Sequence, residues 1–393
     1  MTPLIQLLLL VTLSLSSFVP EAHAGPAPSR PHLDLAPITL QRLKTRGDTN
    51  STVEIKGASS FAKVRRSKKK CTKRATSKNP KGSSYYSALV AVGASYTDNG
   101  HKRDSQYSSS LRNYAPYNSY GGKYTNGKVA VEWMVDSSIS PALPRGGGAV
   151  TLQDYAYGGS VVKNGLGGTG ANSPAAVDQI SSYLSDLKSG SFQPGKGRVL
   201  HYFNSGINPV SQIWNNAMSN GFSASSKANA VAAISANVQA YGASIQSIAN
   251  DKTAQSKLAG SDYVVVGIPP LEIVPTFAWQ VPSGVSKSDA LAFLKQLSSQ
   301  YNSGLQGISS SLRSQASGSK VYYYDMANLW YSMNSSPSSH GITASPSNKS
   351  CYDSSSGKVC SNPESYMYWD TLHPTTSIMK LMAGKINALV AGQ

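Results

Sequence analysis

The sequence is poor in charged residues and in cysteine, and it has no long hydrophobic run after its first twenty residues. Only 14% of the 393 residues are charged, and three are cysteines. The apolar stretch near the C-terminus is broken by Lys380 and Lys385, so it does not read as a membrane span. No group of Cys and His residues has the spacing of a zinc site. These shortages argue against a membrane-embedded body and a structural zinc domain, and no metal or organic cofactor is implied.

The N-terminus has the pattern of a secretory leader. Residues 4–19 are apolar and uncharged, and an Ala-His-Ala sequence ending at Ala24 follows them. A short apolar core followed by small residues is typical of a cleaved signal peptide. We therefore predict a signal peptide over residues 1–24, with a membrane anchor as the alternative, and we expect the mature protein to be soluble and secreted.

The net charge of +17 is concentrated behind this leader. Residues 1–74 hold 13 of the 36 Lys and Arg residues but only 4 of the 19 acidic ones. Such a run can bind nucleic acid or an anionic surface. In an exported chain we favour a basic, poorly ordered pro-segment over residues 25–74, removed by a kexin-like protease after Lys73-Arg74. Contact with an anionic cell wall or lipid is the alternative, and nucleic acid binding is not expected.

The odd number of cysteines fits this interpretation. Removal of the pro-segment takes Cys71 with it and leaves Cys351 and Cys360, nine residues apart. Export to an oxidising compartment permits these two to form a disulfide. Asn-x-Ser/Thr sequences predict N-glycosylation on the same route, at Asn50, Asn334 and Asn348.

Beyond residue 85, apolar runs alternate with helical patterns. The runs typical of buried parallel strands are residues 85–92, 150–156, 199–203, 263–268 and 321–324. Helices are predicted over residues 224–258, 287–313 and 375–391, the first with an interruption at Gly242. This alternation predicts an α/β domain over residues 75–393, with a mostly parallel sheet covered by helices on both faces. In such sheets the chemistry gathers at the carboxyl ends of the strands.

Two short patterns predict nucleophilic catalysis when they are taken together. Ser95 follows the first strand among small residues, but a serine hydroxyl is a weak nucleophile without a base. Asp370 and His373 are three residues apart, so one tight turn can place both side chains on the same side. The carboxylate can then orient the imidazole that takes the serine proton. Each pattern alone is as typical of an ordinary turn.

Two glycine-containing loops could stabilise the oxyanion that forms when an ester is attacked. One covers residues 154–160 and contains Gly158-Gly159, which allow a backbone N–H to approach the substrate. The other covers residues 206–209, after the strand 199–203, where Asn208 offers a side-chain amide. Taken singly, each is also consistent with a simple turn.

In order and spacing, these segments resemble the conserved blocks of the SGNH (GDSL-type) hydrolases. GASYTDNG resembles the block GDSLxDxG, and GGKYTNGKVAVEWM resembles the stretch that follows it in fungal and plant members. DYAYGGS is similar to NYAxGGA, GINP to GxND, and WDTLHPT to DxxHPT. The resemblance covers about residues 85–393 and implies a three-layer α/β/α sandwich of flavodoxin-like type.

The resemblance also implies roles for individual residues. Ser95 corresponds to the nucleophile, and its own N–H to one oxyanion donor. Gly159 corresponds to the backbone donor and Asn208 to the side-chain donor. His373 corresponds to the general base and then acid, and Asp370 to the group that orients it.

The sequence departs from the family blocks at three positions. Ala94 replaces an Asp, Asp154 replaces an Asn, and Pro209 replaces an Asp. The changes at Ala94 and Pro209 remove no triad or oxyanion group, so we expect activity to survive. The absence of a G-x-S-x-G sequence argues against an α/β-hydrolase.

The resemblance therefore implies a secreted carboxylic-ester hydrolase that forms an acyl-Ser95 intermediate. It is closest to the extracellular fungal branch that includes acetylesterases, which favours short-chain acetyl esters of carbohydrate as substrates. A lipid-directed GDSL lipase or phospholipase is one alternative. The other is a catalytically faded secreted protein that binds glycan or a surface. That reading is motivated by Ala94, Pro209 and a tyrosine-rich stretch at Tyr107, Tyr114, Tyr117, Tyr120 and Tyr124.

Overall fold

The computed structural model describes residues 84–100, 123–166 and 173–392. The predicted signal peptide, the pro-segment with its Lys73-Arg74 site, and the glycosylation site Asn50 lie outside these residues. So do four of the five tyrosines of the tyrosine-rich stretch, Tyr107, Tyr114, Tyr117 and Tyr120. They remain predictions from the sequence.

A five-stranded sheet forms the centre of the described chain, and each pair of neighbouring strands is parallel. The order is β2-β1-β3-β4-β5, formed by β1 (Tyr86–Gly93), β2 (Thr151–Asp154), β3 (Arg198–Asn204), β4 (Ser261–Val266) and β5 (Val321–Tyr324). Nearly every side chain of β1 is buried, as expected of a parallel strand with helices on both faces. The parallel α/β sheet predicted from the apolar runs is confirmed.

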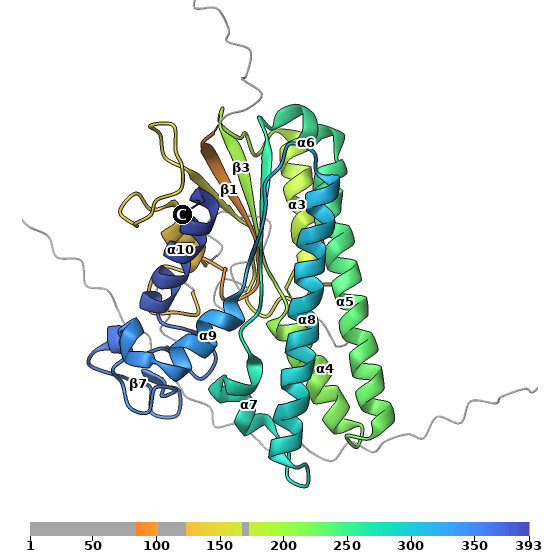
Figure 1. Cartoon of the computed structure of the whole chain (residues 1–393), viewed down its shortest axis with the longest axis vertical. Helices are drawn as coiled ribbons and strands as arrows, with labels where there is room; N and C mark the ends of the chain where they lie inside the picture. Colours follow the sequence, from red (N-terminus) through yellow and green to blue (C-terminus); the bar gives the residue numbers. More distant parts are fainter. Residues whose placement is uncertain (1–83, 101–122, 167–172, 393) are drawn as a thin grey trace, which may run out of the picture. The chain divides into compact units, whose positions relative to one another are not determined.

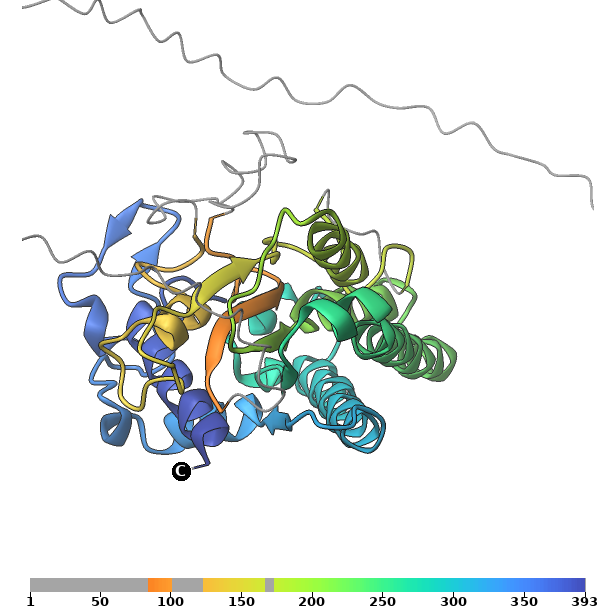
Figure 2. The same ribbon diagram turned by 90° about the horizontal axis from the view of Figure 1, so that it is seen from above.

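Two helical layers cover this sheet (Figures 1 and 2). One layer contains α2 (Ala130–Val135) and α10 (Thr376–Ala391), which pack against each other and contact β1, β2 and β5. The other contains α3 (Ala176–Ser189), α4 (Ile207–Ser219), α5 (Ala224–Asn250), α6 (Lys252–Lys257) and α8 (Lys287–Gln315). The three-layer α/β/α sandwich is therefore confirmed. No helix in the described part of the chain combines the length and the hydrophobicity needed to span a bilayer.

Shorter elements follow the last two strands of the sheet. The segment after β4 contains the 3₁₀ turn η1 (Leu271–Ile273) and α7 (Pro275–Gln280). The segment after β5 contains α9 (Met326–Ser335), the turns η2 (Pro337–His340) and η3 (Pro363–Ser365), and a two-stranded sheet of β6 (Tyr352–Asp353) and β7 (Lys358–Val359). These segments form much of the surroundings of the site described below.

The predicted interruption at Gly242 is wrong, because α5 runs through this residue. A Cβ atom at Gly242 would lie 3.1 Å from Ile308 of α8, so the glycine allows the two long helices to pack closely. The break comes instead at Asp251, whose carboxylate accepts the N–H of Ala254 and caps α6.

Candidate active site

Ser95 lies in a tight turn directly after β1. The N–H groups of Thr97 and Asp98 both donate to the carbonyl of Ala94, at 2.9 Å, and close the turn around Ser95. The end of the strand is crowded, since a Cβ atom at Gly93 would lie 2.6 Å from the carbonyl oxygen of Asn204 on β3. Ser95 itself is 8% exposed. The turn thus places a nearly buried hydroxyl at the carboxyl end of a central strand.

Asp370 and His373 share a second turn, which the structure brings to Ser95. The Oδ1 atom of Asp370 accepts the backbone N–H groups of Leu372 and His373, at 2.8 and 2.7 Å. The Nδ1 atom of His373 lies 2.8 Å from Asp370 Oδ2, and its Nε2 atom lies 2.8 Å from Ser95 Oγ. A carboxylate can only accept, so Nδ1–H donates to Asp370 and leaves Nε2 to accept the serine proton.

The electrostatics of this group favour a charged Asp370. Burial opposes the charge, but the attraction of His373 and the hydrogen bonds from His373 and Leu372 outweigh it. Together they hold the pKa of Asp370 below its ordinary value. A charged carboxylate beside Nδ1–H stabilises the imidazolium that forms when Nε2 takes a proton.

Two tyrosines enclose the His373 ring. The ring of Tyr124 lies 5.1 Å from it, and that of Tyr96 lies 5.9 Å from it. The hydroxyl of Tyr96 donates to the carbonyl of Leu372 at 2.6 Å and so braces the turn that carries His373. Tyr124 is partly buried. Its sequence position gave no signal of this role.

The loop after β2 carries Gly159 close to this group. Gly158 is required because Tyr124 packs against it, within 2.3 Å of where a Cβ atom would lie. Gly159 has a φ of 77°, a conformation that glycine adopts without strain. Among the described residues, no acceptor takes the N–H of Gly159 or that of Ser95. Both N–H groups are thus available to an oxyanion.

Asn208 belongs to a helix and not to a loop, which corrects the interpretation of residues 206–209. It is the second residue of α4, and its amide donates to the carbonyl of Ser160 at 2.8 Å. An amide nitrogen carries two hydrogens, so one is left for a substrate. Pro209 follows in the first turn of α4, where a backbone N–H would have no partner within the helix. The departure at Pro209 is therefore compatible with the fold.

Two buried carboxylates connect the Ser95 turn to the Gly159 loop. Asp98 accepts the N–H of Gly158 at 2.7 Å, and Asp154 accepts the N–H of Asn99 at 3.0 Å. Burial and the charge of Asp98 raise the pKa of Asp154 well above its ordinary value, although backbone N–H groups oppose the shift. Asp154, one of the three departures from the family blocks, thus couples two segments of the site.

Gln179 of α3 is a further buried connection, which the sequence did not reveal. Its side chain accepts the N–H of Gly93 at 2.9 Å and donates to the carbonyl of Gly93 at 3.0 Å and to Ser160 Oγ at 2.9 Å. The residue is 1% exposed. It therefore fixes the end of β1 relative to the residue that follows Gly159.

A cleft of about 1010 Å³ opens at the His373 side of this group. Asp370, Leu372 and His373 form one end of it. The rest is formed by η1, α7, Asn334 of α9 and a segment that we call the disulfide loop, residues 346–360. Trp279 of α7 lines the cleft and is 70% exposed.

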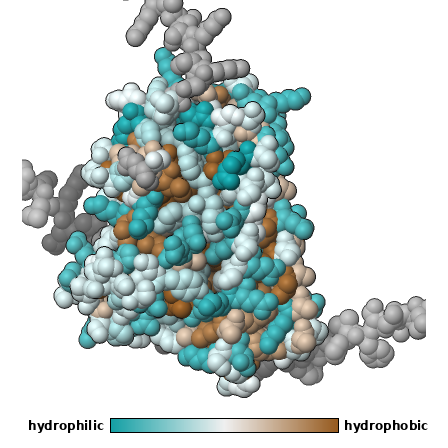
Figure 3. All heavy atoms as spheres, in the orientation of Figure 1, coloured by the Kyte–Doolittle hydropathy of each residue, from teal (hydrophilic) through white to brown (hydrophobic). Residues whose placement is uncertain are grey.

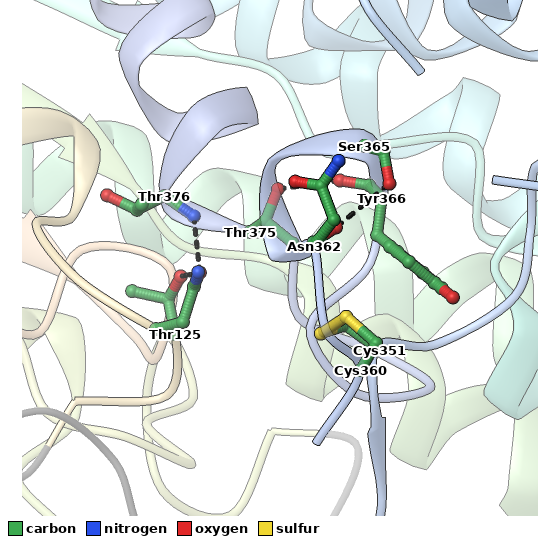
Figure 4. Close-up of a disulfide and its surroundings, with 9 residues drawn as sticks. Thr125, Cys351, Cys360, Asn362, Ser365, Tyr366, Thr375 and Thr376 are labelled. Atoms are coloured by element: carbon green, nitrogen blue, oxygen red, sulfur yellow. Dashed lines mark hydrogen bonds between the residues drawn. A yellow bond between two sulfur atoms is a disulfide. The ribbon is translucent and has the colours of Figure 1, made fainter. Parts of the chain in front are cut away.

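A disulfide between Cys351 and Cys360 closes this loop, as the cysteine count predicts (Figure 4). The loop is also attached to the chain that leads to Asp370. Cys351 N–H donates to the carbonyl of Tyr368, and the ring of Tyr352 stacks on that of Trp369, with their centroids 5.5 Å apart. The wall of the cleft and the turn of the His-Asp pair are thus one connected structure. Within the described residues, no group of three or more His, Cys, Asp or Glu side chains is arranged to hold a metal ion.

Comparison with protein families gives a match over most of the chain. The model described as GDSL-like Lipase/Acylhydrolase matches residues 89–386, which include all the residues of the site described above. Among curated proteins, the chain is 22% identical over 326 residues to GDSL esterase/lipase At1g71691 of Arabidopsis thaliana, covering 76% of this chain and 80% of that protein. It is 24% identical over 303 residues to GDSL esterase/lipase At4g16230 of the same plant, covering 70% and 80%.

Two solved structures are also similar to this chain. An extracellular lipase from Streptomyces rimosus has a TM-score of 0.39 at 12% identity, covering 77% of this chain and 99% of its own. A phospholipase A1 from Streptomyces albidoflavus has a TM-score of 0.37 at 13% identity, covering 78% and 97%.

Proposed function

The chain belongs to the GDSL-like lipase/acylhydrolase family of serine ester hydrolases, and from that premise we propose that it is a secreted esterase acting through Ser95, His373 and Asp370. The observation that carries this proposal is the hydrogen-bonded line from Ser95 Oγ through His373 to Asp370, with 2.8 Å at both steps. Nucleophile, base and orienting group are thus within hydrogen-bonding distance in the order that acyl transfer requires.

In the first half of the reaction, Ser95 Oγ attacks the ester carbonyl carbon while His373 Nε2 takes the hydroxyl proton. The carbonyl oxygen becomes an oxyanion, which the N–H groups of Ser95 and Gly159 and the amide of Asn208 stabilise. When the intermediate collapses, the bond to the alcohol oxygen breaks and His373 gives its proton to that oxygen. An acyl-Ser95 ester and a free alcohol result.

In the second half, water replaces the alcohol. His373 takes a proton from the water, whose oxygen attacks the acyl carbon. Collapse of the second oxyanion breaks the bond to Ser95 Oγ, and His373 returns a proton to the serine. The acid is released, and the charged Asp370 stabilises the imidazolium at both stages.

The favoured substrates are short-chain acetyl esters of carbohydrate. A lipid-directed lipase would be expected to have a broad exposed apolar area near the site. On the face shown in Figure 3, hydrophobic residues are interspersed with hydrophilic ones. The described residues include three exposed large hydrophobic side chains, Trp279, Tyr331 and Val359. The scarcity of such residues favours a small or polar ester over a lipid aggregate.

The same proposal covers export and processing. The disulfide between Cys351 and Cys360 is consistent with an oxidising compartment. Asn334 and Asn348 are both exposed, as an attached N-glycan requires. Mass spectrometry of the secreted protein tests these points: glycans on both asparagines and a chain that begins near Ala75 are expected. An N-terminus at residue 25 would contradict removal of the pro-segment.

The catalytic proposal is tested with the full-length protein and the p-nitrophenyl esters of acetate, butyrate and octanoate. Ser95→Ala is expected to lower kcat by about a thousandfold or more, because it removes the nucleophile. Ser205→Ala is the matched control, since Ser205 is a buried serine whose hydroxyl has no hydrogen-bond partner in the described structure. A steep fall in rate from acetate to octanoate supports an acetylesterase.

Two results would count against the proposal. Folded, disulfide-bonded protein that hydrolyses none of the three esters would favour a faded, glycan-binding protein. A higher rate with octanoate than with acetate would favour the lipid-directed alternative.

A further inference from the structure

The chemistry of the proposed reaction decides on which side of Ser95 the alcohol portion of the ester lies. His373 must give its proton to the alcohol oxygen as the bond to the acyl carbon breaks, so that oxygen must come within hydrogen-bonding distance of Nε2. The Gly159 and Asn208 donors define where the carbonyl oxygen lies. The alcohol portion therefore extends from the His373 side, where the cleft of about 1010 Å³ begins.

The lining of this cleft is of two kinds. The segment around α7 contributes apolar side chains, among them Val274, Pro275 and Trp279. The disulfide loop contributes polar and charged ones, which lie at residues 349–350 and 353–355. The proposed glycosylation sites Asn334 and Asn348 also line the cleft, so the protein is deglycosylated before the tests below. The cleft thus combines an aromatic surface with a set of hydrogen-bonding groups.

The polar part of the lining is charged at neutral pH. Hydrogen bonds from Ser355 and Ser356 lower the pKa of Asp353 to about 2, so this carboxylate is ionised there. Lys349 lies in the same lining. An alkyl chain in the cleft would cover the apolar side chains but would make no hydrogen bond to these polar groups. A ligand with many hydroxyl groups makes such bonds.

Trp279 is the least expected feature of the cleft. A tryptophan side chain that is 70% exposed leaves a large apolar area in water, and covering that area is favourable. Of the three exposed large hydrophobic residues in the described chain, only Trp279 lines this cleft. A sugar ring matches such a lining, because it has an apolar C–H face that can cover an aromatic ring and a rim of hydroxyl groups.

We propose that the cleft is the binding site for the alcohol portion of the ester, that this portion is a saccharide, and that Trp279 is the surface on which a sugar ring stacks. This inference rests on the proposed esterase function and adds a site and a specificity-determining residue to it. Trp279 acts on binding of the saccharide and not on the chemical step.

The test compares two acetyl esters that differ only in the alcohol. One is ethyl acetate, whose alcohol is too small to reach along the cleft, and the other is a monoacetylated disaccharide, whose remaining hydroxyl groups are free. Acetate release is followed by titration at constant pH for the full-length protein and for Trp279→Ala. Trp279→Phe keeps an aromatic surface, and Gln306→Ala is the control, because Gln306 is exposed on α8 and does not line the cleft.

Trp279→Ala is expected to lower kcat/KM for the disaccharide by about tenfold, through KM, and to change kcat/KM for ethyl acetate by less than about twofold. Trp279→Phe is expected to restore a large part of the loss, and Gln306→Ala to match the unsubstituted protein. Equal effects of Trp279→Ala on both esters, or no effect on either, would overturn the inference.

Three further outcomes separate the saccharide site from the proposed esterase function on which it rests. Hydrolysis of ethyl acetate with no hydrolysis of the disaccharide would leave the esterase intact and refute the saccharide site. A loss with Trp279→Ala confined to dodecyl acetate would refute it as well, and would assign the cleft to an alkyl chain. Hydrolysis of no ester at all would refute the proposed function itself.

Discussion

The side chain of Gln179 pairs with the peptide groups of Gly93 in both directions, since it accepts the N–H at 2.9 Å and donates to the carbonyl at 3.0 Å. Gly93 ends the inner strand β1, two residues before Ser95. The same amide donates to Ser160 Oγ, one residue after Gly159. A single buried amide thus sets the distance between the nucleophile turn and the oxyanion loop.

Gln179→Ala is therefore expected to reduce both stability and turnover. The N–H of Gly93 loses its side-chain acceptor and its carbonyl keeps only the N–H of Tyr157 at 3.4 Å, which lowers the free energy of unfolding by about 1–3 kcal/mol. A small displacement of Gly159 relative to Ser95 lowers kcat by roughly ten- to a hundredfold, while KM for p-nitrophenyl acetate changes little. Urea unfolding and steady-state kinetics at a temperature where the variant is folded measure the two effects.

A control on the same helix separates positioning from general destabilisation. Ser181 is exposed on α3, and its hydroxyl contacts only its own helix. Ser181→Ala is expected to leave kcat unchanged. A Gln179→Ala protein that is less stable but has an unchanged kcat would show that Gln179 is structural only.

Asp154 predicts an unusual dependence of stability on pH. Its pKa is raised in the folded protein, so folding retains a proton that the unfolded chain releases above pH 3.8. The stabilisation is full below that pH and is lost as the pH rises toward the raised pKa. The free energy of unfolding falls in this window by up to about 1.4 kcal/mol per pH unit.

The comparison with Asp154→Asn isolates this contribution, because the amide has no proton to lose. The variant lacks one of the two acceptors for the N–H groups of Asn99 and Ala156, so it is expected to be less stable at pH 5. Its free energy of unfolding should nevertheless fall less between pH 5 and pH 8 than that of the unsubstituted protein. The free energies of unfolding are measured by urea titration at both pH values. An equal fall in the two proteins between pH 5 and pH 8 would show that Asp154 is charged in the folded state. Asp370, whose pKa is lowered, contributes with the opposite sign and only toward acid pH.

The sequence predicts the sheet and the location of the site for a physical reason. Buried parallel strands must be apolar on both faces, so they stand out as short continuous runs, and the polar residues that follow them gather at one edge. Ser95 and Gly159 follow β1 and β2 in this way, and the structure brings them to His373.

The side-chain contacts that organise the site cannot be recognised in the sequence in this way. Gln179 lies within an amphipathic helix, and Tyr124 within a tyrosine-rich stretch, so neither differs from its surroundings in the sequence. Trp279 follows a short apolar run that is equally consistent with a buried segment. These residues become identifiable only when tertiary contacts show what each side chain touches.

The disulfide contributes both to the stability of the fold and to the wall of the cleft. The Cys351→Ala/Cys360→Ala double variant is expected to affect the free energy of unfolding and the binding of the saccharide in measurably different ways. A closed loop of this length restricts the unfolded chain, so its loss lowers the free energy of unfolding by about 2–3 kcal/mol.

The N–H groups of Cys351 and Tyr352 still bind the carbonyls of Tyr368 and Trp369, and therefore hold the chain that leads to Asp370. Residues 353–359 lose their covalent closure and are held only by the pairing of β6 with β7, so the positions of their polar groups become less fixed. At a temperature where the variant is folded, we expect kcat/KM for ethyl acetate to stay within about twofold, whereas KM for the monoacetylated disaccharide rises by a larger factor. A rise confined to the disaccharide assigns the loop to saccharide binding, whereas an equal loss on both esters shows that the disulfide serves the His-Asp turn instead.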